Sequence, residues 1–99
     1  MTPLFFVGST ARFDRLARAL RQAHPHEFPR LLERAATILA ADPFNRQRTH
    51  DMRKLEDVPA GHGQYRLRLG RFRFRYDFAA ERVVLQHCGL RREDTYRER

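Results

Sequence analysis

Residues 64–78 carry the side chains whose type and spacing best suit the binding of an anion. Five of the ten residues from Arg66 to Arg75 are arginine, and they alternate with Leu and Phe. A guanidinium stays charged and donates paired N–H groups to phosphate or carboxylate oxygens. Because side chains alternate between the two faces of a strand, this spacing predicts a hairpin with one cationic face and one apolar face.

A two-residue turn at Gly70 and Arg71 sets the register of this hairpin, since glycine at the first central position suits a type II′ turn. The predicted cross-strand pairs are Leu69 with Phe72, Leu67 with Phe74, Tyr65 with Tyr76, Arg68 with Arg73, and Arg66 with Arg75. Like charges directly opposite each other destabilise a strand pair by a few tenths to about 1 kcal/mol. The opposed arginines therefore need an explanation.

Three explanations are open for the cationic face. The guanidiniums can splay into water, Asp77 and acids of the C-terminal segment can neutralise them, or the face can be kept for a bound anion such as RNA phosphate. We favour the anion, because opposed rows of arginine on one sheet face make a preformed positive groove.

The composition indicates one small basic domain over residues 1–99. The chain has 20 basic against 12 acidic residues, all but one of the basic residues being arginine, and a formal net charge of +8. Such an excess indicates a polyanionic partner, namely nucleic acid, an acidic protein or an anionic membrane surface. An alternative explanation is a GC-rich genome that uses arginine in place of lysine on ordinary solvated faces. It accounts for the high net charge but not for the clustering of the arginines.

Cysteine usage and hydropathy favour a cytoplasmic protein. The single cysteine, Cys88, excludes an internal disulfide framework, and its apolar surroundings predict a core residue rather than a nucleophile. No basic region precedes the short N-terminal apolar run, so no signal peptide is expected. No apolar run approaches the length of a membrane span.

The first half of the chain predicts one strand and two helices. Residues 3–7 are expected to form a buried strand that Gly8 ends, and Ser9 or Thr10 can cap the helix that follows. Apolar residues at helical spacing predict that this helix runs to about residue 23. They predict a second helix, with Pro29 in its first turn, that ends near residue 41.

The second half predicts a strand-rich region. Residues 42–63 are expected to be irregular, with 52–55 partly extended, and strands follow at about 64–69, 71–78 and 82–88. The element order is β-α-α-β-β-β. The expected fold class is α+β, with a two-helix hairpin packed on one face of a mostly antiparallel curved sheet.

Two stretches of the chain contain a recurring order of motifs, namely KLEDVPAGHGQYRLRLGRFRFRYDF and RVVLQHCGLRREDTY. The order is a Lys-Leu segment, a Gly-rich loop, an arginine-rich hairpin, an apolar strand and a closing Gly-x-Arg-Arg-x-x-x-Tyr pattern. Over roughly residues 43–97 this pattern resembles the RelE/ParE toxin superfamily of bacterial toxin–antitoxin pairs. The resemblance implies the same α+β fold.

The resemblance implies one of two activities. RelE-like members are mRNA endoribonucleases that inhibit translation, often on the ribosome, whereas ParE-like members inhibit DNA gyrase and are not nucleases. Both kinds are neutralised by an antitoxin that wraps the toxin. The expected partners are an acidic antitoxin and mRNA, free or on the ribosome, with DNA gyrase as the alternative partner. A catalytically silent RNA-binding module is a third reading.

The resemblance also assigns candidate catalytic residues. Arg73 matches a sheet arginine that contacts the scissile phosphate, and Tyr96 matches the C-terminal tyrosine of the nuclease branch. Arg91 and Arg92 both fall at the second catalytic arginine, and Arg92 has the commoner spacing to Tyr96. Lys54 matches a basic position ahead of the Gly-rich loop. The residues expected to bind RNA or antitoxin are Arg53, Arg66, Arg68, Arg75 and Arg91.

The implied reaction is RNA cleavage without a metal ion. The 2′-hydroxyl attacks the adjacent phosphate and displaces the 5′-oxygen, so one proton is removed, another is supplied, and negative charge on the phosphoryl group is stabilised. Arg73 and Arg92 would stabilise this charge, Tyr96 would act as the base and Lys54 would assist. Glu56 and Glu93 are carboxylate alternatives for the base.

The sequence departs from the family pattern at one position. Many relatives carry a histidine directly before the closing arginine pair, where this chain has Leu90. His87, His62 or His50 can supply the missing acid. The histidines show no metal-ligand spacing, so neither a metal site nor a cofactor is expected.

Overall fold

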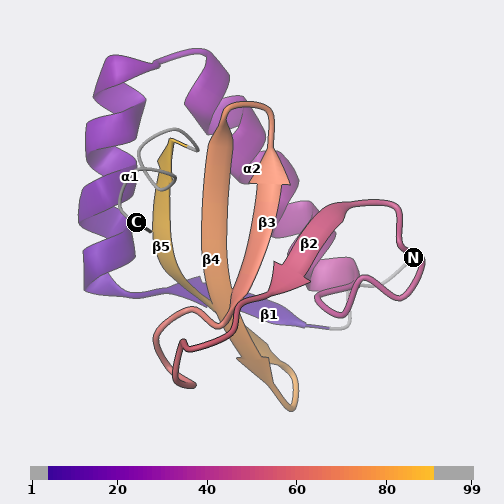
Figure 1. Cartoon of the computed structure of the whole chain (residues 1–99). Coiled ribbons are helices and arrows are strands. Elements are labelled where there is room, and N and C mark those ends of the chain that lie inside the picture. The colour runs from indigo at the N-terminus through magenta and orange to yellow at the C-terminus, as the bar shows by residue number, and fades with distance from the viewer. Residues whose placement is uncertain (1–4, 91–99) are drawn as a thin grey trace.

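The computed structural model describes residues 5–90, which form one five-stranded sheet with two helices against one of its faces (Figure 1). The elements are β1 (Phe6–Ser9), α1 (Ala11–Ala23), α2 (Glu27–Ala41), β2 (Asp51–Lys54), β3 (Tyr65–Leu69), β4 (Phe72–Ala79) and β5 (Arg82–Leu90). The strand order is β1-β5-β4-β3-β2, with β1 parallel to β5 and the other pairs antiparallel. The predicted α+β architecture is confirmed. No helix within residues 5–90 is long and apolar enough to cross a membrane.

The first strand differs from its predicted position. The sequence predicts a buried strand at residues 3–7, whereas β1 runs from Phe6 to Ser9 at the edge of the sheet. Phe6 is 70% exposed, so the prediction of a buried strand is wrong here. Because the helices cover only one face of the sheet, Val7 packs against the core while Phe6 points to the uncovered face (Figure 1). Gly8 lies within the strand and does not end it.

Both helices begin and end close to the predicted residues. Thr10 caps α1, because its Oγ1 accepts a hydrogen bond from the Phe13 N–H at 3.1 Å. Pro29 lies in the first turn of α2, where its missing N–H removes no helical hydrogen bond. The second helix ends at Ala41, as predicted.

The sheet contains one strand more than the predicted order. Residues 52–55, expected to be partly extended, largely coincide with β2, which pairs antiparallel with β3 and ends the sheet. This pairing places Asp51 opposite Arg68, and Arg53 opposite Arg66. The β2 strand therefore widens the sheet face on which the arginines lie.

The hairpin of β3 and β4 forms the floor of the core. Leu67, Phe72 and Phe74 are fully buried, and Tyr76 is 1% exposed. Phe28 of α2 packs on this floor, with its ring centroid 5.3 Å from that of Phe72 and 6.1 Å from that of Phe74. Each such side chain contributes about 1.5–3 kcal/mol on burial, so the apolar side dominates the stability of the hairpin.

The lone cysteine belongs to the same core. Cys88 lies on β5 and is 2% exposed, which confirms its prediction as a core residue. Burial raises the pKa of its thiol to about 12. The thiol is therefore protonated at neutral pH and is a poor nucleophile.

The turn residue Gly70 provides a test of the hairpin register. Its φ is +57°, and a Cβ at this position would lie 3.1 Å from Leu31 Cδ1. We expect Gly70→Ala to lower the free energy of unfolding by about 1–2 kcal/mol, because an L side chain is disfavoured in the left-handed region. Urea denaturation measures this change. Gly8→Ala is the matched control, since a Cβ there meets nothing within 4 Å, and equal losses in the two variants would contradict the assignment.

Candidate nucleic-acid interface

The sheet face away from the helices carries the arginine face, defined by Arg53, Arg66, Arg68, Arg73 and Arg75. Arg66 lies opposite Arg75, and Arg68 opposite Arg73, in the register that the sequence predicts. Arg53 of β2 lies opposite Arg66 and extends the set. The intervening residues of β3 and β4 point into the core, so the predicted two-faced hairpin is confirmed.

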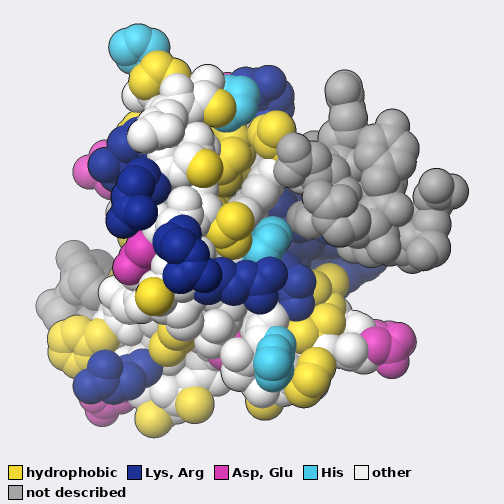
Figure 2. Space-filling view, turned by 90° about the vertical axis from the view of Figure 1, so that its left-hand side faces the viewer, with side chains coloured by type: hydrophobic (Ala, Val, Ile, Leu, Met, Phe, Trp, Pro, Cys, Tyr) yellow, Lys and Arg dark blue, Asp and Glu magenta, His cyan; other side chains and the backbone are white. Residues whose placement is uncertain are grey.

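Basic side chains also cover the outer surface of α1. Four exposed arginines recur at every third residue, namely Arg12, Arg15, Arg18 and Arg21. Figure 2, which looks at the α1 side of the molecule, shows Lys and Arg side chains spread across it. Positive charge is therefore present on α1 as well as on the sheet, and both surfaces attract a polyanion.

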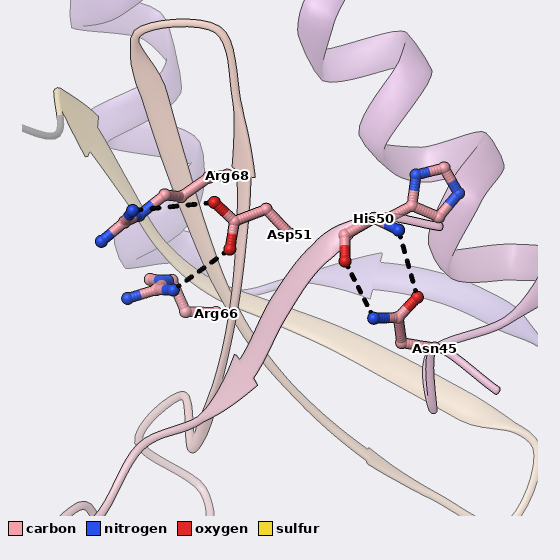
Figure 3. A network of polar contacts seen from close by, with 5 residues as sticks. All are labelled: Asn45, His50, Asp51, Arg66 and Arg68. Atoms are coloured by element: carbon pink, nitrogen blue, oxygen red, sulfur yellow. Dashed lines mark hydrogen bonds and ion pairs between the residues drawn. The ribbon is translucent and has the colours of Figure 1, made fainter. Parts of the chain in front are cut away.

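A carboxylate of β2 lies among the arginines of the sheet. Asp51 Oδ1 is 3.4 Å from Arg66 Nη2, and its Oδ2 is 3.6 Å from Arg68 Nη1 (Figure 3). The Asp51 side chain is 56% exposed, so solvent screens both ion pairs and each contributes at most about 1 kcal/mol. The sequence prediction missed Asp51. The alternation of residues 51–54 would have placed it opposite Arg68 had this segment been taken as a full strand.

Two members of the arginine face are buried, since Arg66 and Arg73 are each 5% exposed. Burial lowers the pKa of Arg66, the charges of Arg68 and Arg73 lower it further, and Asp51 opposes the shift. The guanidinium nevertheless stays protonated near neutral pH. The buried Nε atoms of Arg66 and Arg68 have no hydrogen-bond partner among residues 5–90. Both guanidiniums therefore leave part of their hydrogen-bonding capacity unused within residues 5–90.

Arg75 and Asp77 of β4 clamp the loop that joins β2 to β3. Arg75 donates from Nε to the Gly63 carbonyl at 3.0 Å and from Nη2 to the His62 carbonyl at 2.9 Å. The Asp77 carboxylate accepts from the N–H groups of Gly63 and Gln64, each at 2.9 Å. A Cβ at Gly63 would lie 2.9 Å from Arg75 Cβ, and φ there is +84°, so glycine is required.

This clamp revises two interpretations made from the sequence. Asp77, a predicted counter-ion for the arginines, instead accepts hydrogen bonds from backbone N–H groups. Arg75, predicted to bind RNA or antitoxin, gives two of its nitrogens to loop carbonyls. Its side chain therefore supports the site by positioning the loop beside the other arginines.

The structure separates the three histidines that were candidates for an acid. His87 lies on the arginine face, and its Cε1 is 3.5 Å from the point that a Cβ of Gly89 would occupy. Gly89 is the cross-strand partner of Arg73, so the His87 ring leans toward Arg73. His62 is exposed in the clamped loop. His50 precedes β2 and lines a cavity on the other side of this strand.

Lys54 lies away from the arginine face. It pairs with Tyr65 on the helix side of the sheet, and its Nζ is 6.0 Å from the Tyr65 ring centroid. Its neighbour Arg53 points to the opposite side and is exposed. The strand therefore brings Arg53, but not Lys54, to the face that carries Arg73. Glu56 is exposed in the loop after β2.

The remaining candidates lie outside the described residues, so their roles stay predictions. They are Arg91, Arg92, Glu93 and Tyr96. The same holds for the C-terminal acids that were candidates to neutralise the arginines. Across residues 5–90, no group of three or more His, Cys, Asp or Glu side chains is arranged to hold a metal ion. The described part of the site is thus a surface of guanidiniums with the His87 imidazole and two carboxylates, of which Asp51 pairs with the arginines and Asp77 binds the loop.

Removal of the Asp77 carboxylate tests the clamp. Asp77→Ala deprives the Gly63 and Gln64 amides of their acceptor, so we expect their hydrogen exchange to accelerate about tenfold or more. Amide exchange followed by NMR measures this effect. Glu81→Ala removes an exposed carboxylate from the turn between β4 and β5 and serves as the control. Unchanged exchange at both amides in Asp77→Ala would show that the clamp is absent in solution.

Comparison with known proteins supports the fold through structure and not through sequence. No protein-family model matches the chain, and no curated protein sequence matches it. A chain in the crystal structure of the toxin–antitoxin complex RelBE2 from Mycobacterium tuberculosis is similar, with a TM-score of 0.65, 22% identity, and coverage of 92% of this chain and 94% of that chain. A chain in the archaeal RelE–RelB complex from Pyrococcus horikoshii has a TM-score of 0.60, 24% identity, and coverage of 89% and 96%. The protein therefore has the fold of these two chains, one from the RelBE2 toxin–antitoxin complex and one from a RelE–RelB complex, as the sequence pattern implies.

Proposed function

We propose that this protein is the toxin of a type II toxin–antitoxin pair and an mRNA endoribonuclease that inhibits translation. The observation that carries the proposal is the arginine face, where the buried Nε atoms of Arg66 and Arg68 have no hydrogen-bond partner among residues 5–90. RNA phosphates supply anionic acceptors at regular spacing along a flexible backbone. The fold shared with RelE–RelB complexes supports the same class of protein.

The proposed chemistry is attack by the 2′-hydroxyl of the RNA. The 2′-oxygen forms a bond to the adjacent phosphorus and the bond from phosphorus to the 5′-oxygen breaks, which leaves a cyclic phosphate and a 5′-hydroxyl. Arg73, with Arg92 as its predicted partner, stabilises the negative charge that develops on the phosphoryl oxygens. The flanking backbone is held by Arg66, Arg68 and Arg53.

Two proton transfers complete the proposed reaction. Tyr96 removes the proton of the 2′-hydroxyl, and His87 gives a proton to the departing 5′-oxygen. Among the three histidine candidates, His87 is assigned this role because its ring lies on the arginine face and leans toward Arg73. Lys54 is left out of the proposed set, because its side chain lies over Tyr65 on the other side of the sheet.

An acidic antitoxin is the proposed protein partner. The chain carries a formal net charge of +8, and an acidic partner would neutralise charge that repels itself in the free protein. Two of the similar solved structures are the RelBE2 toxin–antitoxin complex and a RelE–RelB complex, which supports a partner of this kind here.

Cleavage of RNA by the purified protein tests the proposed function. In the presence of a metal chelator, the wild type is expected to cut an mRNA at defined sites, mapped by primer extension. Arg73→Ala is expected to lower the cleavage rate about a hundredfold or more, since it removes stabilisation of the developing charge. The control is Arg34→Ala, which removes the same charge from an exposed position on α2.

Two results would overturn this proposal. One is an intact mRNA together with inhibition of DNA gyrase supercoiling, which would favour the ParE-like alternative. The other is equal cleavage by Arg73→Ala and wild type, which would remove the arginine face from the chemistry. Loss of cleavage in Lys54→Ala would return Lys54 to the catalytic set.

The assignment of His87 as the acid has its own test. His87→Ala is expected to cleave normal RNA slowly but to recover most of the wild-type rate on a substrate whose 5′-bridging oxygen is replaced by sulfur. Recovery follows because a thiolate leaves without being protonated. Arg73→Ala should gain no comparable rescue, since it still lacks charge stabilisation. Equal rescue of both variants, or of neither, would contradict a proton-donating role for His87.

A further inference from the structure

Asp51, the first residue of β2, brings a carboxylate of the protein itself to the arginine face. Its Oδ1 is 3.4 Å from Arg66 Nη2 and its Oδ2 is 3.6 Å from Arg68 Nη1, so each oxygen faces a different guanidinium (Figure 3). A phosphodiester likewise offers two charged oxygens on one centre to a pair of arginines. The Asp51 carboxylate therefore holds nitrogens that a bound phosphate would use.

The contacts of Asp51 with the two guanidiniums are loose. Hydrogen bonds between a guanidinium and a carboxylate are usually about 2.7–2.9 Å long, and both distances here are longer. The Asp51 side chain is 56% exposed, so water competes for its oxygens. An anion with better contacts can therefore take over the guanidiniums, and the released carboxylate is then solvated by water.

The surrounding positive charge exceeds what Asp51 neutralises. Arg66 lies opposite Arg53 of β2. Arg68 lies opposite Arg73 of β4. Within residues 5–90, no second carboxylate pairs with Arg66 or Arg68. The arginine face therefore keeps its attraction for a polyanion while Asp51 is in place.

The backbone that carries Asp51 is held on both sides, so only the side chain has to move. The Asn45 side chain donates to the His50 carbonyl at 2.9 Å and accepts from the His50 N–H at 3.3 Å, which fixes the residue before β2 (Figure 3). Met52, the residue after Asp51, packs against the core. Rotation of the exposed side chain can thus turn the carboxylate into water while β2 stays paired with β3.

We propose that Asp51 is a built-in competitor for phosphate, which occupies Arg66 and Arg68 in the free protein and is displaced by a phosphate group of bound RNA. The proposal rests on the proposed function only in taking RNA as the anion. A single phosphate has few other contacts with which to offset the cost of displacing Asp51, whereas a chain of phosphates also reaches Arg53 and Arg73. Asp51 therefore lowers the affinity of the arginine face and restricts it to anions long enough to reach further arginines.

Binding of a short 2′-O-methyl oligouridine tests the proposal, because this RNA lacks the 2′-hydroxyl nucleophile and stays intact. Fluorescence anisotropy measures its dissociation constant on the full-length protein at one fixed salt concentration. Asp51→Asn keeps the shape of the side chain and removes its charge, so we expect binding to become about three- to tenfold tighter. Glu81→Gln makes the same charge change at an exposed position in the turn between β4 and β5, and should change binding by less than about twofold.

A double variant shows whether Asp51 acts through the arginines that it contacts. Arg68→Gln removes one of its two partners, so in this background Asp51→Asn should tighten binding less than it does in the wild type. An equal gain in both backgrounds would overturn the proposal. Weaker binding by Asp51→Asn would also overturn it, because a carboxylate that only positioned Arg66 for RNA would weaken binding when removed.

Direct observation of the carboxylate covers the case in which Asp51→Asn fails to fold. In the wild type, the carbon-13 NMR signal of the Asp51 carboxyl group should shift when the oligonucleotide saturates the protein, and the signal of the Glu81 carboxyl group should stay in place. An Asp51 signal that does not respond to the oligonucleotide would contradict the displacement.

The test separates this proposal from the proposed function, because binding of the oligonucleotide needs no cleavage. Tighter binding by Asp51→Asn in a protein that leaves mRNA intact would refute the nuclease and support the role of Asp51. Cleavage of mRNA by the wild type, with Asp51→Asn and Glu81→Gln binding the oligonucleotide equally, would refute the role of Asp51 and support the nuclease.

Discussion

The packing of Leu67, Phe72, Phe74 and Tyr76 on the helices is the interaction on which the rest of the structure depends. It fixes which face of the β3–β4 hairpin is buried, and the opposite face must then carry the arginines. Burial of four such side chains contributes several kcal/mol, at about 1.5–3 kcal/mol each, whereas each pair of opposed arginines costs up to about 1 kcal/mol. The apolar side therefore decides the register, and the charges must accommodate it.

The arginine face is only partly compensated within residues 5–90. Asp51 meets two guanidiniums at 3.4 and 3.6 Å, which is too loose and too exposed to offset the burial of Arg66. The other carboxylate on this side, Asp77, is bound to the loop together with Arg75. Asp77 and Arg75 use their hydrogen bonds to hold the loop that joins β2 to β3 beside the arginine face. Arg66 and Arg73 keep the desolvated charge that makes them suited to an anion.

The parts of the fold that follow from local pattern could be predicted from the sequence. Alternation and one glycine set the hairpin register, and helical spacing set α1 and α2. The features that the sequence prediction missed or placed wrongly depend on pairing between strands that lie far apart in the chain. The edge position of β1 depends on its parallel contact with β5, and the role of Asp51 depends on β2 lying beside β3. The clamp joins Gly63 to Asp77 across 14 residues, and no periodicity signals such a contact. The closing motif lies outside the described residues from residue 91 onward. That part of the candidate site stays a prediction, whereas the part on the sheet is observed.

Strand β2 contributes residues to both sides of the sheet. Asp51 and Arg53 lie opposite Arg68 and Arg66, whereas Met52 and Lys54 lie opposite Leu67 and Tyr65 on the helix side. The packing of Met52 against the core therefore fixes the strand that also carries Asp51. Asp51 is the one carboxylate seen to pair with Arg66 and Arg68 within residues 5–90, and it competes with a bound phosphate for the same donors. The anion affinity of the arginine face thus depends on how firmly the opposite side of this short strand is packed.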